Sequence, residues 1–559
     1  MSDQPWFVHY PEGVSHKLSI PPETLVAMLS RSAQRFARRP ALYFFGKTIS
    51  YRECYSLVER FACHLAASGV RKGDRVALCL PNSPQAVIAY FGILKAGGIV
   101  VSCNPTYTEY ELSHQLRDAG ARAIVVLDMM HQKIQHLDLE LVIVTRITDF
   151  MTTIVKYIYQ RRNGRPPIEI PCSATTMFFH DFLNGANPVA PEQLPTVSPD
   201  DIAVLQYTGG TTGVSKGAEL RHRNLMANIR QLVSWFSPTE RTESFLAALP
   251  LFHVFGMTVT QNICLAVGGC MVLVPDPRNI QMLLSVIRKK QPTVVSLVPV
   301  LVQKLLEHCT EKDFEAARFC LCGGAALSYE LLKKFKERTG QLIVEGYGLS
   351  ECSPVTHCNI ARGLSVKHSI GLPIANTEAK IVDEAGQEVP LGGVGELWVR
   401  GPQVMQGYWN NPEETAKVMR PEGWLATGDM ARMDEDGFFY VVDRKKDMIL
   451  SASGFNVYPS EVEKVLRLHK EVREAAVIGL LSEDGCESVK AVVVPFANEV
   501  SEHDLINHCR RYLAPYKVPR HIEFRSELPR TILGKTLYRV LRKEEADRLH
   551  ASTPSGVMR

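Results

Sequence analysis

The 559-residue chain contains 14 cysteines, yet it has no Cys-x-x-Cys pair. Only Cys320 and Cys322 lie close together, and the other cysteines are scattered along the chain. A zinc site needs paired ligands at short spacing, and a secreted disulfide scaffold needs a higher cysteine density in a shorter chain. The cysteines are therefore expected to be buried thiols in a reducing compartment.

The chain also lacks a strong excess of charge of either sign, with 63 basic and 59 acidic side chains and a formal net charge of +4. This balance gives no indication of nucleic-acid binding. The first residues have neither the basic start nor the apolar run of a signal peptide, which favours a cytoplasmic protein. The proportions of 45% apolar and 22% charged residues exclude bulk disorder, collagen-like repeats and a coiled-coil rod.

No Asp, Glu, Lys or Arg occurs between Phe245 and Pro275, a stretch long enough to cross a bilayer. Polar and helix-breaking residues interrupt it, among them Pro250, His253 and Gly268-Gly269. Because polar groups in lipid need internal partners, such a composition disfavours a membrane span. The stretch is predicted to be a buried helix followed by a buried strand at 270–274.

The order of the remaining segments predicts a mainly α/β chain of several domains. A length of 559 residues corresponds to three to four units of roughly 150 residues. Short apolar, β-branched runs without alternation predict strands buried on both faces of a parallel sheet. Strands are predicted at 75–80, 99–103, 123–127 and 202–207, and helices at 84–95, 109–118 and 224–235.

The sequence pattern changes after Gly386, where short apolar runs separated by turn residues predict a small β-rich subdomain. The tail from about residue 447 is predicted to form its own α+β unit, in which Ser501 and Asp504 resemble a capping box. Residues 151–167 predict a solvated surface helix, and their mixed basic and apolar character leaves a membrane-surface contact open. In the tail, helices are predicted at 460–468 and 501–512, and strands at 475–480 and 489–496.

The most informative segment follows the strand at 202–207 and reads Tyr207-Thr-Gly-Gly-Thr-Thr-Gly-Val-Ser-Lys-Gly217. Glycines let the backbone approach a polyphosphate and aim N–H groups at it, while hydroxyls add donors and Lys216 adds positive charge. The spacing is not that of a Walker A loop. The segment is predicted to bind phosphates through Thr208, Gly209, Gly210, Thr211, Thr212, Gly213 and Lys216.

Six further motifs follow this loop along the chain. They read Pro250-Leu-Phe-His-Val-Phe-Gly256, Glu345-Gly-Tyr-Gly-Leu-Ser-Glu351, Thr427-Gly-Asp429, Asp443-Arg-Lys-Lys-Asp447, Gly454-Phe-Asn-Val-Tyr-Pro-Ser-Glu461 and Pro529-Arg-Thr-Ile-Leu-Gly-Lys535. In this order, and over essentially the whole chain, they resemble the adenylate-forming ligases, which include acyl-CoA synthetases, adenylation domains of peptide synthetases and luciferases. The amino-acid sequences of residues 205–213 and 454–459 look most like those of the bacterial long-chain fatty acyl-CoA synthetases.

The resemblance implies a fold of two parts. A large N-terminal α/β region of several subdomains, one of them β-rich, would span 1–445 and bind AMP and the acyl group. A small mobile C-terminal α+β domain would span 446–559, with a hinge near Lys446. In relatives the small domain rotates between two half-reactions and presents Lys535 first and the Gly454 loop second.

The resemblance also implies roles for single residues. Tyr347, between Gly346 and Gly348, would stack on adenine, with Gly324 and Ala325 against the other face and Ser350 in the same motif. Asp429 would accept both ribose hydroxyls, and Arg444 would donate to the same sugar. Glu351 would bind Mg²⁺ with Thr208 as a second ligand, and His253 would lie between the acyl pocket and the adenylate. Lys535 would contact the attacking carboxylate and the α-phosphate.

The implied activity is that of an acid–thiol ligase which converts a fatty acid, ATP and coenzyme A into acyl-CoA, AMP and pyrophosphate. An aryl or modified acid as substrate, an acyl-AMP ligase that delivers to a carrier protein, and an inactive lipid-binding homologue stay possible. A peripheral contact at the inner face of the membrane and a homodimer are left open. The sequence departs from close relatives at Leu450-Ser-Ala-Ser-Gly454, which is one residue longer, at Cys486-Glu-Ser488 and after Lys535.

Overall fold

The computed structural model describes residues 4–163, 168–173, 175–186, 188–208, 215–240, 242–360, 369–450, 456–481, 487–496, 500–531 and 534–552. The chain divides into two compact units. Unit 1 comprises residues 1–378 and 400–425, and unit 2 comprises residues 379–399 and 426–559. No helix among the described residues is long and apolar enough to cross a membrane.

Unit 1 contains a seven-stranded sheet in the order β7-β6-β5-β3-β4-β8-β9. Neighbouring strands run parallel except β8 and β9, which form an antiparallel pair. This confirms the predicted parallel sheet, and its central strands are buried because helices cover them. The strands are β3 (Arg75–Cys79), β4 (Ile99–Ser102), β5 (Ala121–Leu127), β6 (Leu141–Thr145), β7 (Thr176–Phe178), β8 (Ile202–Thr208) and β9 (Lys216–Arg221).

A second sheet of unit 1 has nine strands in the order β16-β15-β14-β13-β12-β10-β11-β1-β2. Its central strands are parallel, and both edges carry antiparallel strands. The strands are β1 (Pro40–Phe44), β2 (Lys47–Ser50), β10 (Ser244–Ala247), β11 (Cys270–Leu273), β12 (Val294–Leu297), β13 (Phe319–Cys322), β14 (Ile343–Gly348), β15 (Val355–Cys358) and β16 (Leu372–Pro373).

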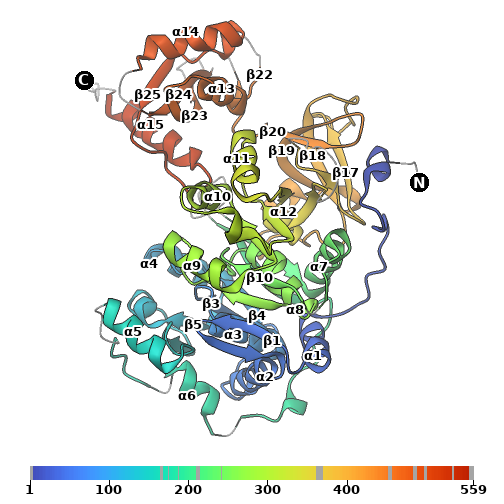
Figure 1. The fold of residues 1–559 in the computed structure, drawn as a ribbon, viewed down its shortest axis with the longest axis vertical. Helices are drawn as coiled ribbons and strands as arrows, with labels where there is room; N and C mark the ends of the chain where they lie inside the picture. Colours follow the sequence, from blue (N-terminus) through green and yellow to red (C-terminus); the bar gives the residue numbers. More distant parts are fainter. Residues whose placement is uncertain are drawn as a thin grey trace, which may run out of the picture. The chain divides into compact units, whose positions relative to one another are not determined.

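The helices of unit 1 pack on these sheets, as α3 does on β3 and β4 (Figure 1). Ser83 accepts a hydrogen bond from the Ala86 amide and Pro84 occupies the first turn, so α3 starts where local chemistry favours it. The helices are α1 (Leu25–Arg35), α2 (Tyr51–Ala67), α3 (Pro84–Lys95), α4 (Glu109–Ala119), α5 (Thr153–Asn163), α6 (Phe179–Asn184), α7 (His222–Phe236), α8 (Ile263–Ala266), α9 (Ile280–Lys290), α10 (Pro299–Leu306), α11 (Tyr329–Thr339) and α12 (Pro412–Val418).

The uncharged stretch after Phe245 forms strand β10, a buried helix and strand β11. The helix and the second strand were predicted, whereas β10 was not. The helix is continuous from residue 254 to 266, and its middle, Gly256–Asn262, has π-helical hydrogen bonds. A π segment is often found at functional sites.

Unit 2 holds most of a four-stranded sheet, in the order β17-β18-β19-β20, and a three-stranded sheet, in the order β23-β24-β25. Ser501 and Asp504 form the predicted capping box at the start of α14. The boundary near Lys446 stays a prediction. The elements are β17 (Glu378–Val382), β18 (Gly395–Arg400), β19 (Leu425–Met433), β20 (Phe439–Arg444), β21 (Ile449–Leu450), β22 (Asn456–Val457), β23 (Val472–Leu481), β24 (Glu487–Pro495), β25 (His521–Phe524), α13 (Pro459–Arg467), α14 (Glu502–Tyr512) and α15 (Tyr538–Ser552).

The thirteen cysteines that the structure describes are all free thiols. All are buried except Cys172, which is exposed, and Cys270, which is half-buried. This agrees with the expected buried thiols, and Cys486 lies outside the described residues.

Candidate functional site

The predicted phosphate loop connects β8 to β9. Thr208 pairs with Lys216 in this antiparallel ladder, and Tyr207 pairs with Gly217. A Cβ atom on Gly217 would lie 3.1 Å from the Tyr207 ring, so a glycine suits this position. Thr208 and Lys216 are therefore held opposite each other at the base of the loop. Gly209, Gly210, Thr211, Thr212 and Gly213 lie outside the described residues.

Lys216 and Glu351 come from separate motifs, but the structure joins them in one side-chain network. Lys216 forms an ion pair with Glu414, and its Nζ lies 5.4 Å from the centre of the Tyr408 ring. The Tyr408 hydroxyl donates a hydrogen bond to Glu351 Oε1 at 2.7 Å. Burial and the Glu351 carboxylate raise the pKa of Tyr408, so the hydroxyl keeps its proton and acts as a donor. The network unites a predicted phosphate ligand with a predicted metal ligand.

The sequence motifs did not include Tyr408 and Glu414. A local signal does mark this region, since Asn411 caps α12 and Pro412 occupies its first turn. That signal predicts a helix start but no partner for its side chains. Lys216 and Glu414 are 198 residues apart in the chain, and only the tertiary fold brings them together.

Glu351 lies in a short 3₁₀ turn, Ser350–Cys352, directly after β14. The turn packs against β8 and β9, and the Glu351 carbonyl accepts a hydrogen bond from the Met405 amide at 2.7 Å. Tyr408 therefore orients one carboxylate oxygen of Glu351, and the Met405 amide holds the Glu351 backbone in place. Among the described residues no group of three His, Cys, Asp or Glu could form a metal site. Oxygen donors such as Glu351 and the Thr208 hydroxyl nevertheless fit Mg²⁺, which binds one or two carboxylates with phosphate oxygens and water.

The glycines predicted around adenine follow two neighbouring parallel strands. Cys322 of β13 pairs with Glu345 of β14, so the residues after these positions lie side by side. A Cβ atom on Gly323 would lie 3.0 Å from the Gly346 carbonyl oxygen, and Gly324 has a φ of +84°. Both positions favour glycine, one by close approach and one by backbone conformation. The structure thus brings Gly324 and its neighbour Ala325 beside the Gly346 motif.

Tyr347 is half-buried at the end of β14, where it pairs with His357 of β15. The Tyr347 and His357 rings meet edge to face, with centroids 5.8 Å apart. Gly348 follows, and a Cβ atom there would collide with the Pro354 carbonyl. The Tyr347 ring therefore contacts a buried histidine, and glycines flank Tyr347 in the chain.

His253 lies at the start of the buried helix 254–266. Its amide donates to the Pro250 carbonyl at 3.1 Å, and its Nδ1 accepts from the Phe255 amide at 3.3 Å. A Cβ atom on Gly256 would collide with the same Pro250 carbonyl, so the loop closes only with glycine there. The half-buried imidazole is thus fixed at one end of an apolar helix.

In unit 2, Asp429 and Arg444 pair across the β19–β20 ladder. Arg444 Nε lies 2.7 Å from Asp429 Oδ1, and the side chains are 43% and 2% exposed, respectively. Gly428, which precedes Asp429 in the chain, has a φ of +70°, and the Gly428 amide donates a hydrogen bond to Glu396 Oε1 at 3.2 Å. A buried carboxylate is therefore oriented by a half-exposed guanidinium.

Two predicted lysines also belong to unit 2. Lys446 lies in a turn closed by the Asp447 amide and the Arg444 carbonyl at 2.9 Å, and burial lowers the pKa of Lys446. Lys535 is exposed directly after Gly534. Gly454 and the longer loop before it lie outside the described residues. The other described site residues are in unit 1.

Comparison with protein families gives two matches. The AMP-binding enzyme family model matches residues 29–409, and the model of the AMP-binding enzyme C-terminal domain matches residues 461–535. The matched regions contain Thr208, Lys216, Tyr347, Glu351 and Lys535.

Similar proteins align over nearly the whole chain. The long-chain-fatty-acid–CoA ligase of Bacillus subtilis (strain 168) is 42% identical over 98% of this chain and 99% of its own length. The feruloyl-CoA synthase of an Amycolatopsis species is 34% identical over 91% of this chain and 96% of its own. The structure of ATP-bound MatB from Rhodopseudomonas palustris superposes with a TM-score of 0.81 at 29% identity, covering 94% of this chain and 100% of that chain.

Proposed function

Since the chain belongs to the AMP-binding enzyme family, we propose that it activates a long-chain fatty acid with ATP and transfers the acyl group to coenzyme A. The fatty carboxylate attacks the α-phosphate of ATP, and pyrophosphate leaves as acyl-AMP forms. The thiolate of coenzyme A then attacks the acyl carbon, and AMP leaves. The similarity to the B. subtilis long-chain-fatty-acid–CoA ligase, which spans 98% of this chain, carries this proposal.

The triphosphate of ATP is proposed to bind over the base of the β8–β9 loop. In the described structure Lys216 is paired with Glu414, and hydrogen bonds from Lys216 and Lys417 lower the pKa of Glu414. A triphosphate carries more negative charge than one carboxylate, so it competes with Glu414 for Lys216. Glu351 and Thr208 are proposed to bind Mg²⁺, which when bound neutralises phosphate oxygens. The five loop residues 209–213 add backbone and hydroxyl donors.

The nucleoside is proposed to contact separate motifs through its base and its sugar. Tyr347 offers a ring face to adenine, and Gly324, Ala325, Gly346, Gly348 and Ser350 leave room beside it. Asp429, oriented by Arg444, accepts the ribose hydroxyls. Lys535 contacts the carboxylate and the α-phosphate, and His253 separates the acyl chain from the adenylate. The Gly454 loop serves thioester formation.

The acyl chain is proposed to lie along the buried helix 254–266, whose side chains near His253 are apolar. Acyl-CoA formation should therefore rise by about fourfold for each added methylene until the pocket is full, because each buried methylene contributes about 0.8 kcal/mol. The measurement is acyl-CoA formation across saturated acids of graded length, with benzoate and cinnamate as comparison acids. A preference for cinnamate over every aliphatic acid would instead support an aryl-CoA ligase.

Acyl-AMP detection and pyrophosphate exchange, measured beside acyl-CoA formation, test for a carrier-protein ligase and for an inactive homologue. Acyl-AMP without acyl-CoA would support a ligase that delivers to a carrier protein. Absence of pyrophosphate exchange with every acid would support an inactive lipid-binding homologue. The homodimer that the sequence left open is not tested by these assays.

We further propose that α5 makes the peripheral membrane contact that the sequence left open. Ile154, Tyr157 and Ile158 are 74%, 61% and 46% exposed on one face of this helix. The opposite face packs on the turn between β1 and β2, where the Tyr159 and Phe45 rings are 6.2 Å apart. The exposed apolar face is therefore not explained by packing within the chain.

The positive charge of the α5 segment favours an anionic lipid surface. No Asp or Glu occurs between Phe150 and Ile168, whereas Lys156, Arg161, Arg162 and Arg165 do. Basic residues near an anionic membrane contribute about 1 kcal/mol each. An interfacial helix combines such charges with exposed apolar side chains.

Replacing both Ile154 and Ile158 with glutamate should weaken binding to phosphatidylglycerol vesicles by at least about tenfold, since two apolar groups are lost and two repelled charges are gained. Co-sedimentation with vesicles measures this. Leu468→Glu, at a side chain 61% exposed in unit 2, is the matched control. Equal binding of the wild type and the double variant would contradict the role of α5.

A further inference from the structure

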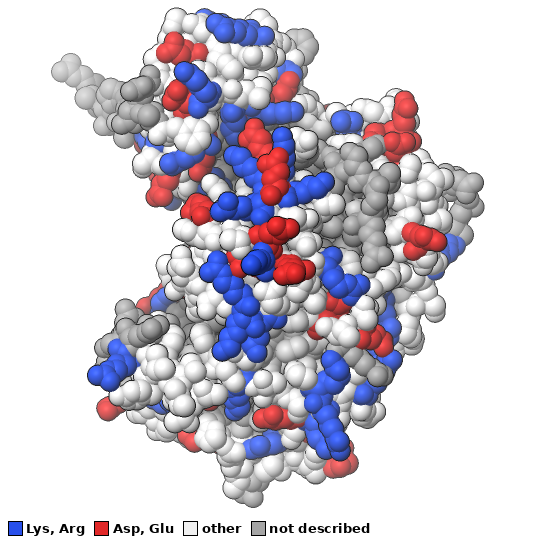
Figure 2. All heavy atoms as spheres, viewed as in Figure 1, with Lys and Arg blue, Asp and Glu red and all other residues white. Residues whose placement is uncertain are grey.

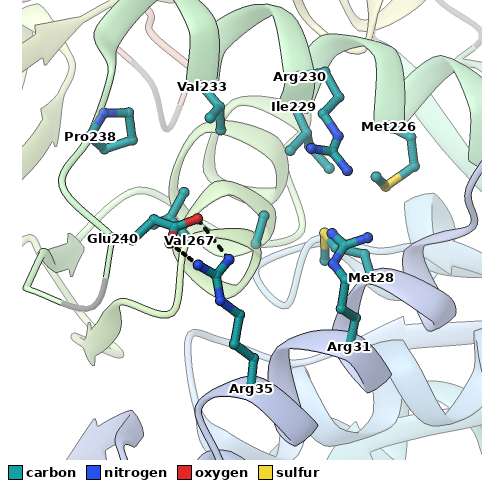
Figure 3. Close-up of a pocket in the computed structure, with 11 residues that line it drawn as sticks. Met28, Arg31, Arg35, Met226, Ile229, Arg230, Val233, Pro238, Glu240 and Val267 are labelled. Carbon is teal, nitrogen blue, oxygen red and sulfur yellow. Dashed lines mark hydrogen bonds and ion pairs between the residues drawn. The ribbon is translucent and has the colours of Figure 1, made fainter. Parts of the chain in front are cut away.

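A cavity of about 250 Å³ lies between α1, α7 and the end of α8 in unit 1 (Figure 3). Its apolar lining is half-buried at Val233, Pro238 and Ala266. Three guanidinium groups also line it, from Arg31, Arg35 and Arg230. These arginine side chains are 46%, 50% and 36% exposed, so they are accessible from solvent. The cavity thus combines an apolar wall with a cationic rim.

The acidic side chains at this rim do not balance the arginines. Glu23 accepts hydrogen bonds from both Arg31 and Arg230, and Glu240 pairs with Arg35. Figure 3 shows Arg31 and Arg230 reaching toward each other from α1 and α7. Among the described residues, two carboxylates pair with these three guanidinium groups, so one positive charge remains for an anion. Glu23 accepts one hydrogen bond from Arg31 and one from Arg230, whereas each guanidinium group carries five N–H donors.

A second, shallower hollow adjoins the first through Arg35. Arg35 lines both, and Arg38, Arg39 and Arg52 line the second. In the view of Figure 2, Lys and Arg side chains gather over the region of α1. The positive rim therefore extends past the end of α1, which would suit a head group larger than one carboxylate.

The cavity lies apart from the motifs of the proposed active site. It is linked to them by the buried helix 254–266, which begins beside His253 and ends at Ala266, a residue that lines the cavity. Neither the sequence motifs nor the nucleotide chemistry uses α1, Arg230 or Glu240. The proposed active site therefore gives the three arginines at the rim no function.

We propose that this cavity is a second binding site, for an amphipathic anion that consists of an acyl chain and a carboxylate or phosphate head group. The chain lies on Val233, Pro238 and Ala266, and the head group bonds to Arg31, Arg35 and Arg230. Guanidinium groups bind carboxylate and phosphate through paired, charge-assisted hydrogen bonds. Free fatty acid and acyl-CoA both carry this chemistry.

The test is photolabelling of the full chain with a diazirine-bearing long-chain fatty acid, without ATP or coenzyme A, followed by mass spectrometry of the peptides. Label is expected on peptides of α1 and α7. Excess dodecyl phosphate should remove it, and dodecanol, which has the tail without the charge, should not. Competition by unlabelled fatty acid and by acyl-CoA distinguishes the two sources.

The double variant Arg35→Gln/Arg230→Gln should reduce labelling of α1 and α7 by at least about tenfold, the usual effect of losing a charge-assisted hydrogen bond. Labelling of residues 252–262, which include His253 and do not line the cavity, should not change. Arg278→Gln is the matched control, because Arg278 forms a surface ion pair with Asp276 away from the cavity. Val233→Trp, which fills the cavity and keeps its charges, should also abolish the label.

Absence of label on α1 and α7 in the wild type would overturn the proposal, as would equal labelling of the wild type and the variants, or protection by dodecanol. Because these measurements need neither ATP nor turnover, they are independent of the acyl-CoA assay. A chain that fails to form acyl-CoA can still show this second site, and an active ligase can lack it.

Discussion

Replacing Lys535 with alanine is expected to slow acyl-AMP formation by roughly 10²- to 10³-fold, the usual effect of losing one donor to a transition state. Conversion of supplied acyl-AMP to acyl-CoA should be much less affected, because the ammonium group acts on the developing charge of the first step. Pyrophosphate exchange measures the first step. Synthetic acyl-AMP with coenzyme A measures the second.

The local structure explains why Lys535 is suited to this role. The Thr531 amide donates to the Lys535 carbonyl, and the Gly534 amide donates to the Thr531 carbonyl, both at 2.8 Å. Gly534 has a φ of +80°, and Arg530 binds both the Gly534 carbonyl and Glu474, at 2.6 and 2.7 Å. A tight turn, anchored by an arginine, thus presents an exposed lysine.

Two controls sharpen the Lys535 experiment. Lys470→Ala removes a lysine that is 85% exposed in the same unit, and it should change neither step. Gly534→Ala keeps the ammonium group but strains a backbone that favours glycine, so it should slow the first step by a smaller factor. A bulky side chain at Gly454 should impair mainly the second step. Equal loss of both steps in the Lys535 and Gly454 variants would contradict the division of labour between these loops.

Replacing Asp429 with alanine is expected to raise the KM for ATP by roughly 10- to 100-fold. The variant loses the acceptor for the ribose hydroxyls, and a hydrogen bond to a charged group contributes about 1.5 to 3 kcal/mol. Steady-state kinetics with varied ATP measures the effect. Asp429→Asn keeps a carbonyl acceptor and should lie between the wild type and the alanine variant.

Asp313→Ala is the matched control for this prediction. Arg288 Nε lies 2.8 Å from Asp313 Oδ1, and the side chains are 50% and 3% exposed, close to the geometry of Arg444 and Asp429. Both variants lose a buried carboxylate that is paired with an exposed arginine, so both should lower thermal stability. Only Asp429→Ala should change the KM for ATP. An equal change in both variants would assign the effect to stability and not to the ribose.

Much of the fold could be predicted from the sequence where local chemistry decides it. Helix α3 begins at Pro84 and ends at Lys95, as predicted, because the Ser83 cap, the proline and the apolar run lie within one short segment. The strands predicted at 75–80 and 99–103 are observed at 75–79 and 99–102, because β-branched, apolar residues favour buried parallel strands. The capping box of Ser501 and Asp504 was predicted in the same way.

Other elements depended on distant partners and were missed. Strand β9 follows the phosphate loop only because β8 offers it an antiparallel edge. Strand β25 pairs in parallel with β24, and its short apolar pattern gives little signal alone. The π-helical turns at Gly256–Asn262 depend on hydrogen bonding within a buried helix, which composition does not reveal.

For the candidate site, the sequence by itself determined which chemical groups are proposed to act: the glycine and threonine loop, Lys216, Glu351, Asp429, Arg444 and Lys535. Only the tertiary structure decided how some of them are paired. It joined Lys216 to Glu414 and Glu351 to Tyr408, and it placed three arginines of α1 and α7 around one cavity. The reason is physical: backbone conformation follows from neighbours in the chain, whereas side-chain partners are chosen by packing between segments that can be about 200 residues apart.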